Sequence, residues 1–154
     1  MNLIISTGSN IGERESYLIE AKNKLASLYK LVEESNIYES PAVDYLNQPD
    51  FLNQVLSFEL PKQNPSSVML QLLEIEKEMG RKRDIDKGPR TIDLDILFWG
   101  LEALNSPQLT TPHPRLFERS FIVLPLKELA VFPVLAEKFK FPKKFDNSCW
   151  VFKS

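Results

Sequence analysis

The fold and the chemistry of this chain centre on the segment Gly88-Pro89-Arg90-Thr91-Ile92-Asp93-Leu94-Asp95-Ile96-Leu97-Phe98. From Ile92 onward, apolar residues alternate with Asp93, Asp95 and Leu97, which is the period of two that is typical of a β-strand. The pattern predicts an apolar face on a core, formed by Ile92, Leu94, Ile96 and Phe98. The opposite face carries two carboxylates, about 7 Å apart along an extended backbone.

Asp93 and Asp95 point to chemistry rather than to packing, because aspartate is a poor strand former. Two like charges at this separation raise each other's pKa unless a cation intervenes. A pair of divalent metals about 3.5–4 Å apart would suit the spacing and would organise a phosphate-transfer reaction. On the local pattern alone, the alternative that both aspartates simply decorate a solvent-facing surface stays open.

The composition is that of one ordinary globular domain. The chain has 154 residues, 43% hydrophobic and 26% charged, which suffices for a core and a soluble surface. Its formal net charge of -2 gives no global attraction to nucleic acid or to an anionic membrane. Cys149 is the only cysteine, so no intrachain disulfide can form, which favours a reducing compartment.

The sequence shows no targeting or membrane-spanning pattern. Met1–Ser6 lack the basic and long apolar regions of a signal peptide, and no apolar stretch approaches the roughly 18 residues needed to cross a bilayer. We therefore expect a single domain over residues 1–154 that is cytoplasmic and monomeric, with neither nucleic acid nor membrane as a partner.

The predicted order of elements is strand, helix, strand, strand, helix, strand. The expected strands are 3–7, 31–38, 51–60 and 92–98, and the expected helices are 13–28 and 65–79. Asn64 and Pro65 form a typical helix start, and Gly80 a typical end. This order predicts an α+β fold of the ferredoxin-like kind, a three-layer sandwich in which helices cover a mainly antiparallel sheet.

Beyond Gly100 the chain is punctuated by prolines. A short helix is expected over 121–130, broken at Pro125, and the tail from Phe132 onward gives no assignable pattern. Near the start, Gly8-Ser9-Asn10-Ile11-Gly12 superficially resembles a phosphate loop but lacks the lysine and the spacing of a Walker A motif. Its glycines favour a tight turn into the following helix. One cysteine and one histidine argue against a Cys/His zinc site.

Arginines form a second constellation, because their planar guanidinium groups match phosphate oxygens. They are Arg81, Arg83, Arg90, Arg115 and Arg119. Surface pairing with nearby acids is the simpler explanation for any one of them, but Arg90 and Arg119 flank the carboxylates and the histidine. His113, the only histidine, is held between Pro112 and Pro114. It can contact phosphate as a donor, or merely cap a turn.

Four ordered segments closely resemble the family of 6-hydroxymethyl-7,8-dihydropterin pyrophosphokinases, enzymes of folate biosynthesis. They are residues 8–12, 48–53 and 88–97, and Pro112-His113-Pro114 followed by Arg119 and Phe121. The match runs from the first strand to about Ala130. The resemblance implies a ferredoxin-like α+β fold and the transfer of a pyrophosphoryl group from ATP to the pterin hydroxymethyl group, with release of AMP.

The resemblance also implies roles for individual residues. Asp93 and Asp95 would hold two Mg²⁺ ions between the triphosphate and the pterin hydroxyl, and Arg81 and Arg90 would join them in catalysis by closing over the nucleotide. The residues implied at the ATP site are Glu76, Arg83, Arg90, Ile96, Thr110, His113 and Arg119. Those implied at the pterin site are Ser40, Pro41, Val43, Phe51, Asn53 and Phe121, with the two phenylalanines stacking on the ring and Asn53 reading its edge.

The chain departs from some relatives in the loop between Arg81 and Arg90, which is a residue shorter and has Lys87 in place of a tryptophan.

Two other functions compete with the pyrophosphokinase. A metal-dependent phosphodiesterase or nuclease would use the same aspartates without a pterin acceptor. A non-catalytic ferredoxin-like module would bind nucleic acid or a small ligand without needing Mg²⁺.

Overall fold

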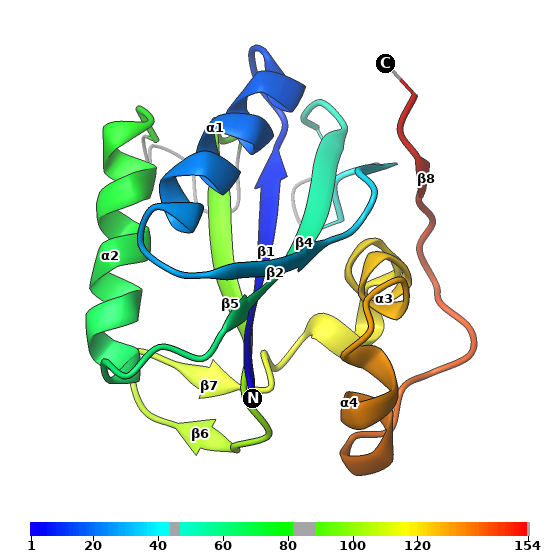
Figure 1. Ribbon diagram of the computed structural model, residues 1–154. Helices are drawn as coiled ribbons and strands as arrows, with labels where there is room; N and C mark the ends of the chain where they lie inside the picture. Colours follow the sequence, from blue (N-terminus) through cyan, green and yellow to red (C-terminus); the bar gives the residue numbers. More distant parts are fainter. Residues whose placement is uncertain (44–46, 82–88, 154) are drawn as a thin grey trace.

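The computed structural model describes residues 1–43, 47–81 and 89–153, and its described strands form one antiparallel sheet of six strands with a small separate ladder (Figure 1). The strands of the main sheet are β1 (Asn2–Ser9), β2 (Leu31–Glu34), β3 (Tyr38–Ser40), β4 (Phe51–Glu59), β5 (Asp93–Trp99) and β8 (Trp150–Val151). Their order is β5-β1-β4-β3-β8, with β2 also paired to β4. The small ladder joins β6 (Leu104–Asn105) to β7 (Thr110–Thr111).

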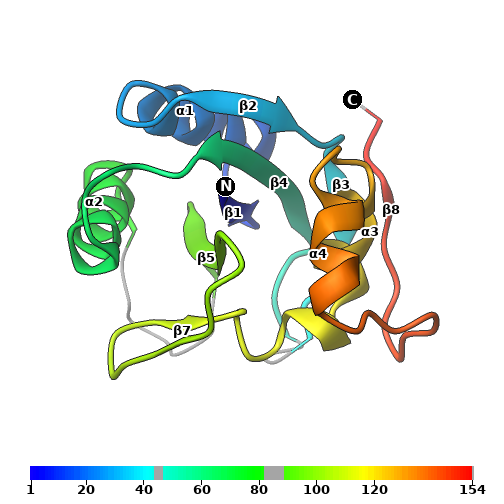
Figure 2. The ribbon, with the colours of Figure 1, turned by 60° about the horizontal axis from the view of Figure 1, so that its bottom comes forward.

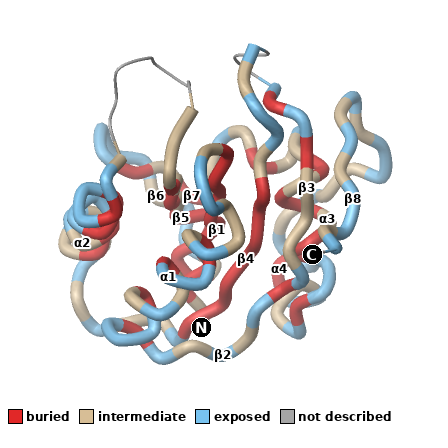
Figure 3. Tube along the Cα trace, turned by 90° about the horizontal axis from the view of Figure 1, so that it is seen from above, coloured by how far each residue is buried: buried red, intermediate tan, exposed pale blue. Residues whose placement is uncertain are grey.

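Two pairs of helices cover opposite faces of the sheet (Figure 2). The helices are α1 (Arg14–Ala26), α2 (Pro65–Glu78), α3 (Ser120–Lys127) and α4 (Phe132–Lys138), with a 3-10 turn at Leu116–Glu118. Leu3 and Ile5 of β1 pack in the core under α1 and α2, whereas Ile4 packs in the core under α3 and α4. Both central strands, β1 and β4, are consequently buried along almost their whole length (Figure 3). The structure thus confirms a mixed α and β fold with an antiparallel sheet.

The expected helix signals are confirmed. The Asn64 side chain accepts a hydrogen bond of 2.9 Å from the Ser67 N–H, and Pro65 occupies the first turn of α2. Gly80 follows the helix with a φ of +81°, a conformation that favours glycine. Gly12 likewise has a φ of +70° in the turn before α1, as the sequence predicts. None of the helices in the described ranges is long and apolar enough to cross a membrane.

The single strand expected over 31–38 is wrong, because the chain forms β2 and β3 with an interruption between them. Ser35 lies in that interruption and is buried. Its N–H donates to the Val55 carbonyl at 3.0 Å, and its hydroxyl accepts from the Val55 N–H at 3.0 Å. The Gln54 side chain donates to the Ser35 carbonyl at 2.7 Å. Side-chain hydrogen bonds therefore replace the regular ladder at this point.

The expected position of Phe98 is also wrong. Ile92, Leu94 and Ile96 pack under α1 and α2 as predicted, but Phe98 packs in the opposite core, together with Leu97. The cause is a β-bulge: Ile5 pairs with Ile96 and Ile4 pairs with Phe98, so that Leu97 is the extra residue. An extra residue shifts the alternation, and a strict period of two cannot foresee it.

One expectation about the C-terminal third needs correction, and the structure assigns the tail that the sequence left open. Helix α3 is not broken at Pro125 but continues through it to Lys127. The proline removes one hydrogen bond, and the burial of Ile122, Val123 and Leu126 against the sheet holds the short helix in place. The tail is also ordered into α4 and β8, two elements too short to give a periodic signal.

Candidate active site

Strand β5 carries Asp93 and Asp95 at the sheet end where the turn after β1 lies. In the antiparallel register, Asp93 is opposite Gly8 and Asp95 is opposite Ser6. The pleat directs both carboxylates toward the face covered by α3. Both side chains are only partly buried, and both line two adjoining clefts. The carboxylate face of the predicted strand therefore lines the clefts, where Asp93 and Asp95 are neither fully exposed nor packed in a core.

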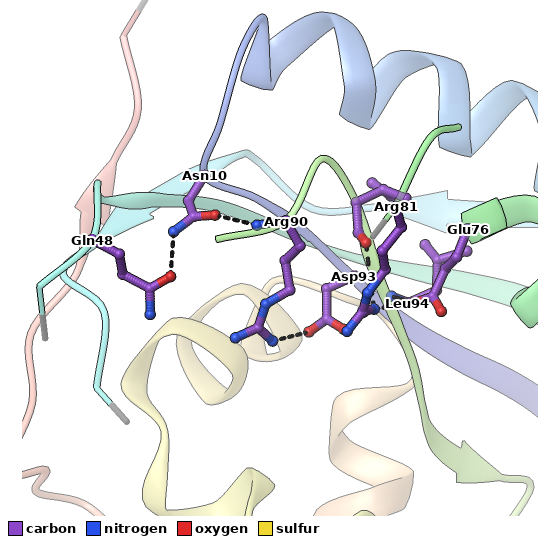
Figure 4. A network of polar contacts seen from close by, with 8 residues as sticks. Asn10, Gln48, Glu76, Arg81, Arg90, Asp93 and Leu94 are labelled. Atoms are coloured by element: carbon purple, nitrogen blue, oxygen red, sulfur yellow. Dashed lines mark hydrogen bonds and ion pairs between the residues drawn. The ribbon is translucent and has the colours of Figure 1, made fainter. Parts of the chain in front are cut away.

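Asp93 is held by two arginines (Figure 4). Arg81 Nη1 lies 2.7 Å from Asp93 Oδ1, and Arg90 Nη1 lies 3.3 Å from Asp93 Oδ2. The same Arg81 nitrogen lies 2.5 Å from Oε2 of Glu76, a buried residue at the end of α2. That Glu76 oxygen also accepts the Leu94 N–H at 2.8 Å. Glu76 therefore links helix α2, Arg81 and the carboxylate strand.

The backbone of Arg90 is fixed by Asn10, which the sequence analysis did not single out. The buried Asn10 side chain accepts from the Arg90 N–H at 2.9 Å and donates to Gln48 Oε1 at 2.9 Å and to the Pro49 carbonyl at 3.0 Å (Figure 4). The Arg90 guanidinium lies 5.2 Å from the ring centre of Phe51, within cation–π range. Asn10 thus joins three of the four segments on which the family resemblance rests. The only sequence signal that could have identified it is its place between two glycines in a turn.

Asp95 has a strongly perturbed acidity. Its pKa is raised from 3.8 to about 7, first by burial and then by the negative charges of Asp93 and Glu76, while Arg119 and Arg81 oppose the shift. The sequence predicts that the two aspartates raise each other's pKa, and Asp95 shows this effect. Without a bound cation, this side chain carries a proton in part of the molecules at neutral pH.

Substituting Asp95 with asparagine should raise the free energy of unfolding at pH 8 by roughly 1–2 kcal/mol, after a discount for the water that reaches this partly exposed group. The raised pKa means that the native state holds the proton more tightly than the unfolded chain. The contribution of Asp95 to stability is thus most favourable below pH 3.8 and is lost as the pH rises to about 7. Asparagine stays neutral and escapes this loss.

Urea unfolding without divalent ions measures this effect at pH 5 and pH 8. The stability gap between Asp95→Asn and the natural chain should widen from the lower to the higher pH. Asp146→Asn, at an exposed position of the tail, should show no such widening. A gap that is the same at both pH values would show that the pKa of Asp95 is close to normal.

The first cleft has about 610 Å³ of open space and lies between the ends of β3 and β4 on one side and the start of α3 on the other. It brings together all six residues expected at a pterin site: Ser40, Pro41, Val43, Phe51, Asn53 and Phe121. The Asn53 amide donates to the Ser40 hydroxyl at 2.9 Å, which fixes the orientation of the amide. Arg119 lies with its guanidinium 5.9 Å from the Phe121 ring centre. Two aromatic rings and a fixed amide suit a flat heterocycle with a polar edge.

The second cleft has about 830 Å³ of open space and lies on the side of α2. Of the residues expected at an ATP site, Glu76, Arg90, His113 and Arg119 line it, together with Arg81. Arg90, Asp93, Asp95 and Arg119 line both clefts. The two carboxylates therefore lie where the clefts meet, which is where a group transferred between two ligands would pass.

His113 is buried enough for its acidity to change. Its pKa is lowered first by burial and then by the positive charge of Arg119. Asp93 opposes this shift, and Arg115 adds a smaller lowering effect. Its Nδ1 accepts the Arg115 N–H at 3.3 Å, so the proton of the neutral ring lies on Nε2. The histidine thus offers one N–H donor to the second cleft.

Two residues expected at the ATP site, Ile96 and Thr110, do not line the second cleft, and a third lies outside the described residues. Ile96 is fully packed in the core under α1 and α2 and lines neither cleft, because it lies on the apolar face of β5. Thr110 is part of the small β6–β7 ladder and also lines neither cleft. Arg83, like Lys87, falls outside the described residues.

The second cleft also contains Arg115, one of the arginines noted in the sequence, and two residues that the sequence analysis missed, Met69 and Leu73. Met69, Leu73 and Glu76 recur at i, i+4 and i+7 along α2, so they share one helix face. This face lies beside the buried stripe of Val68, Leu72 and Ile75, which dominates the sequence pattern. The sequence signal for this part of the cleft was a second, partly apolar stripe beside the core stripe of α2. Leu73 in this stripe remains 44% exposed.

Comparison with known proteins gives a family match over most of the chain. Residues 4–131 match the model of 7,8-dihydro-6-hydroxymethylpterin-pyrophosphokinase (HPPK). The chain is 41% identical over 127 residues to the 2-amino-4-hydroxy-6-hydroxymethyldihydropteridine pyrophosphokinase of Bacillus subtilis, covering 81% of this chain and 75% of that protein. The Aquifex aeolicus protein of the same name is 40% identical over 125 residues, covering 81% of this chain and 78% of its own length.

The similarity extends to longer proteins and to a solved structure. The folic acid synthesis protein fol1 of Pneumocystis carinii is 42% identical over 127 residues, which are 82% of this chain but 17% of that protein. A crystal structure of a Plasmodium falciparum HPPK-DHPS triple mutant with pteroate superposes with a TM-score of 0.59 at 15% identity, covering 82% of this chain and 39% of that one. The chain belongs to the 7,8-dihydro-6-hydroxymethylpterin-pyrophosphokinase family, the pyrophosphokinases of folate synthesis.

Proposed function

We propose that this chain transfers the pyrophosphoryl group of ATP to the hydroxymethyl group of 6-hydroxymethyl-7,8-dihydropterin, giving AMP and the pterin diphosphate. The observation that carries this proposal is the junction of two clefts at Asp93 and Asp95. The first cleft would hold the pterin between Phe51 and Phe121, and the second would hold ATP. Transfer in line between two bound ligands needs this side-by-side placement.

The carboxylate pair fits magnesium as its metal. Mg²⁺ is usually held by one or two carboxylates together with substrate phosphates, and not by a cage of protein ligands. Asp93 and Asp95, which both line the place where the clefts meet, supply the two carboxylates of this mode. Asp93 and Asp95 would hold two Mg²⁺ ions against the triphosphate. When bound, the ions would offset the charge that develops on the transferred group.

The arginines would change partners when the nucleotide arrives. Arg81 and Arg90 now lie against the two oxygens of Asp93. Coordination of those oxygens to magnesium would weaken both ion pairs and direct the guanidinium groups toward phosphate oxygens. Arg119 and the Nε2–H of His113 would contact the phosphates from the opposite wall. Each of these groups would bind or orient the triphosphate, and the pterin hydroxyl would attack the β-phosphorus.

A product assay tests the proposal. The purified chain is incubated with ATP, Mg²⁺ and 6-hydroxymethyl-7,8-dihydropterin, and the nucleotides and pterins are separated. AMP should appear in equal amounts with the pterin diphosphate. ADP as the nucleotide product would contradict the transfer of a pyrophosphoryl group. Release of AMP without any pterin present would instead support a metal-dependent phosphodiesterase.

Replacing Phe121 with alanine should weaken pterin binding by about 5- to 150-fold and leave nucleotide binding nearly unchanged. Stacking of a flat heterocycle on an aromatic side chain contributes roughly 1–3 kcal/mol. Calorimetry with the pterin, and separately with a non-hydrolysable ATP analogue and Mg²⁺, measures both affinities. Phe132→Ala is a matched control, because that ring packs against Phe141, away from the cleft. Equal pterin affinity in Phe121→Ala and the natural chain would remove the stacking role.

We also propose the finer description of the fold and setting. The strand order β5-β1-β4-β3, with α1 and α2 on one face and α3 and α4 on the other, supports a ferredoxin-like three-layer sandwich. The protein would act as a single domain, as a monomer, in the cytoplasm. Sedimentation of the purified chain with and without ATP analogue tests the monomer.

A further inference from the structure

The C-terminal segment (residues 139–153) connects both walls of the first cleft, although the family match ends at residue 131. It leaves α4, runs past α3 and reaches the edge of the sheet at β8 (Figure 1). Phe139, Phe141 and Phe145 anchor it on the core under α3 and α4. Its polar contacts, in contrast, go to residues on either side of the cleft.

Asn147 binds the backbone at the start of α3. Its Oδ1 accepts the Ser120 N–H at 2.8 Å and the Ser120 hydroxyl at 2.6 Å. Its Nδ2 donates to the Glu118 carbonyl at 2.7 Å. Helix α3 has no capping hydrogen bond from the side chain of its own N-cap residue, Arg119. Asn147 therefore satisfies the first helical N–H from a position 27 residues farther along the chain.

Two of these hydrogen bonds fix the backbone on either side of Arg119 and directly before Phe121, and the third holds the Ser120 side chain. Both residues line the first cleft, and Arg119 lines the second cleft as well. Ser120 itself is 2% exposed, so its N–H and hydroxyl have little access to water if Asn147 is removed. The direction of the Phe121 ring and of the Arg119 guanidinium thus depends on an amide outside the cleft.

The far end of the segment holds the opposite wall. Trp150 and Val151 pair with Glu39 and Tyr38 of β3, and the Trp150 indole N–H donates to Glu39 Oε1 at 3.2 Å. The next residue of β3 is Ser40, whose hydroxyl orients the Asn53 amide. The chain after Asn147 therefore runs from the Phe121 wall to the Asn53 wall in a few residues.

We propose that Asn147 is a positioning residue for the pterin cleft, which sets Phe121 and Arg119 at the distance from the Asn53 wall that the flat ring needs. This inference rests on the proposed function. If Asn147 served only the stability of the fold, its removal would lower the stability of the whole chain and leave the affinity of the folded molecules for pterin unchanged. If Asn147 is a positioning residue, its removal also lowers that affinity.

The test compares Asn147→Ala with Asp146→Ala, an exposed neighbour in the same segment. Asn147→Ala should weaken pterin binding about tenfold, because the buried N–H and hydroxyl of Ser120 lose the Asn147 oxygen, the exposed Glu118 carbonyl loses its donor, and the helix start shifts. Asp146→Ala should bind pterin as the natural chain does. Asn147→Asp should restore part of the affinity, because its carboxylate still accepts both bonds from Ser120 but cannot donate to Glu118.

A stability-matched variant separates positioning from stability. Leu135→Val shortens a buried side chain of α4 and should lower the melting temperature without changing pterin affinity. If Asn147→Ala does not fold, Ser120→Ala takes its place. It removes the hydroxyl bond to Asn147 and the contact of that hydroxyl with Cys149 but keeps both backbone bonds, so it should give a smaller loss of affinity. Pterin affinity equal to that of the natural chain in Asn147→Ala, or a loss no greater than in Leu135→Val, would overturn the proposal.

Hydrogen exchange supplies a readout that does not depend on the reaction. The amides of Ser120, Phe121 and Ile122 should exchange faster in Asn147→Ala than in the natural chain, and pterin should slow them in the natural chain. If the natural chain formed no AMP, the proposed function would be refuted, but these exchange rates would still report on the hydrogen bonds that Asn147 makes to the start of α3. If exchange at these three amides were unchanged, the positioning role of Asn147 would be refuted and the proposed function would not be affected.

Discussion

Replacing Asp95 with alanine should lower kcat by about 10³-fold or more, the size of effect expected when a group that holds a catalytic metal is lost. Asp95 lies where the two clefts meet, and its carboxylate is one of two oxygen donors proposed for Mg²⁺. The loss should fall on turnover, since the aromatic walls of the first cleft remain. Steady-state rates of AMP formation at saturating Mg²⁺ measure it.

The stability of this variant distinguishes lost chemistry from lost structure. Removing a carboxyl group whose pKa is raised to about 7 relieves an unfavourable charge at pH 8, so Asp95→Ala should melt at the same temperature as the natural chain or higher. Glu137→Ala, at an exposed position of α4, should keep full activity. Full turnover in Asp95→Ala would eliminate the proposed metal role.

Replacing Glu76 with alanine should destabilise the chain by about 3 kcal/mol, because it leaves the Arg81 guanidinium and the Leu94 N–H short of a buried partner. Glu76 is 4% exposed and receives both groups on one oxygen. For a chain of this length, such a loss corresponds to a fall in melting temperature of roughly 10 °C. Thermal and urea unfolding followed by circular dichroism measure the change.

Glu78→Ala on the same helix is the matched control. Glu78 pairs with Lys24 at 3.3 Å, but its side chain is 50% exposed. An exposed ion pair contributes about 0–1 kcal/mol, so the control should unfold close to the natural chain. Equal stabilities of the two variants would mean that Glu76 serves the nucleotide and not the fold.

Much of the sheet was predictable, because its long elements carry regular signals. The alternation in 92–98, the apolar run at 3–7 and the Asn64-Pro65 helix start each correspond to an element with nearly the expected bounds. The errors fall where one residue changes a pattern. A bulge at Leu97 turns Phe98 to the other core, and Ser35 interrupts what looked like one strand. Short elements such as α4 and β8 form through tertiary contacts that no local period records.

The residues of the candidate site could be predicted where they belong to the motifs of the family that the chain resembles. The resemblance selected all six residues of the first cleft, and spatial proximity between residues as distant as Ser40 and Phe121 then came from the fold. Asn10 and Asn147 were missed for a common reason. Each acts through backbone groups of a remote segment, and a sequence does not show which backbone an amide will meet.

Arg81 and Arg90, the two arginines beside Asp93, flank residues 82–88 in the sequence. Arg81 is tied to Glu76 and Asp93, and Arg90 is tied by its backbone to Asn10. The anchors that the described residues show thus belong to α2 and to the turn after β1. The packing of these two elements on the sheet therefore also sets the separation of the two positive charges beside Asp93.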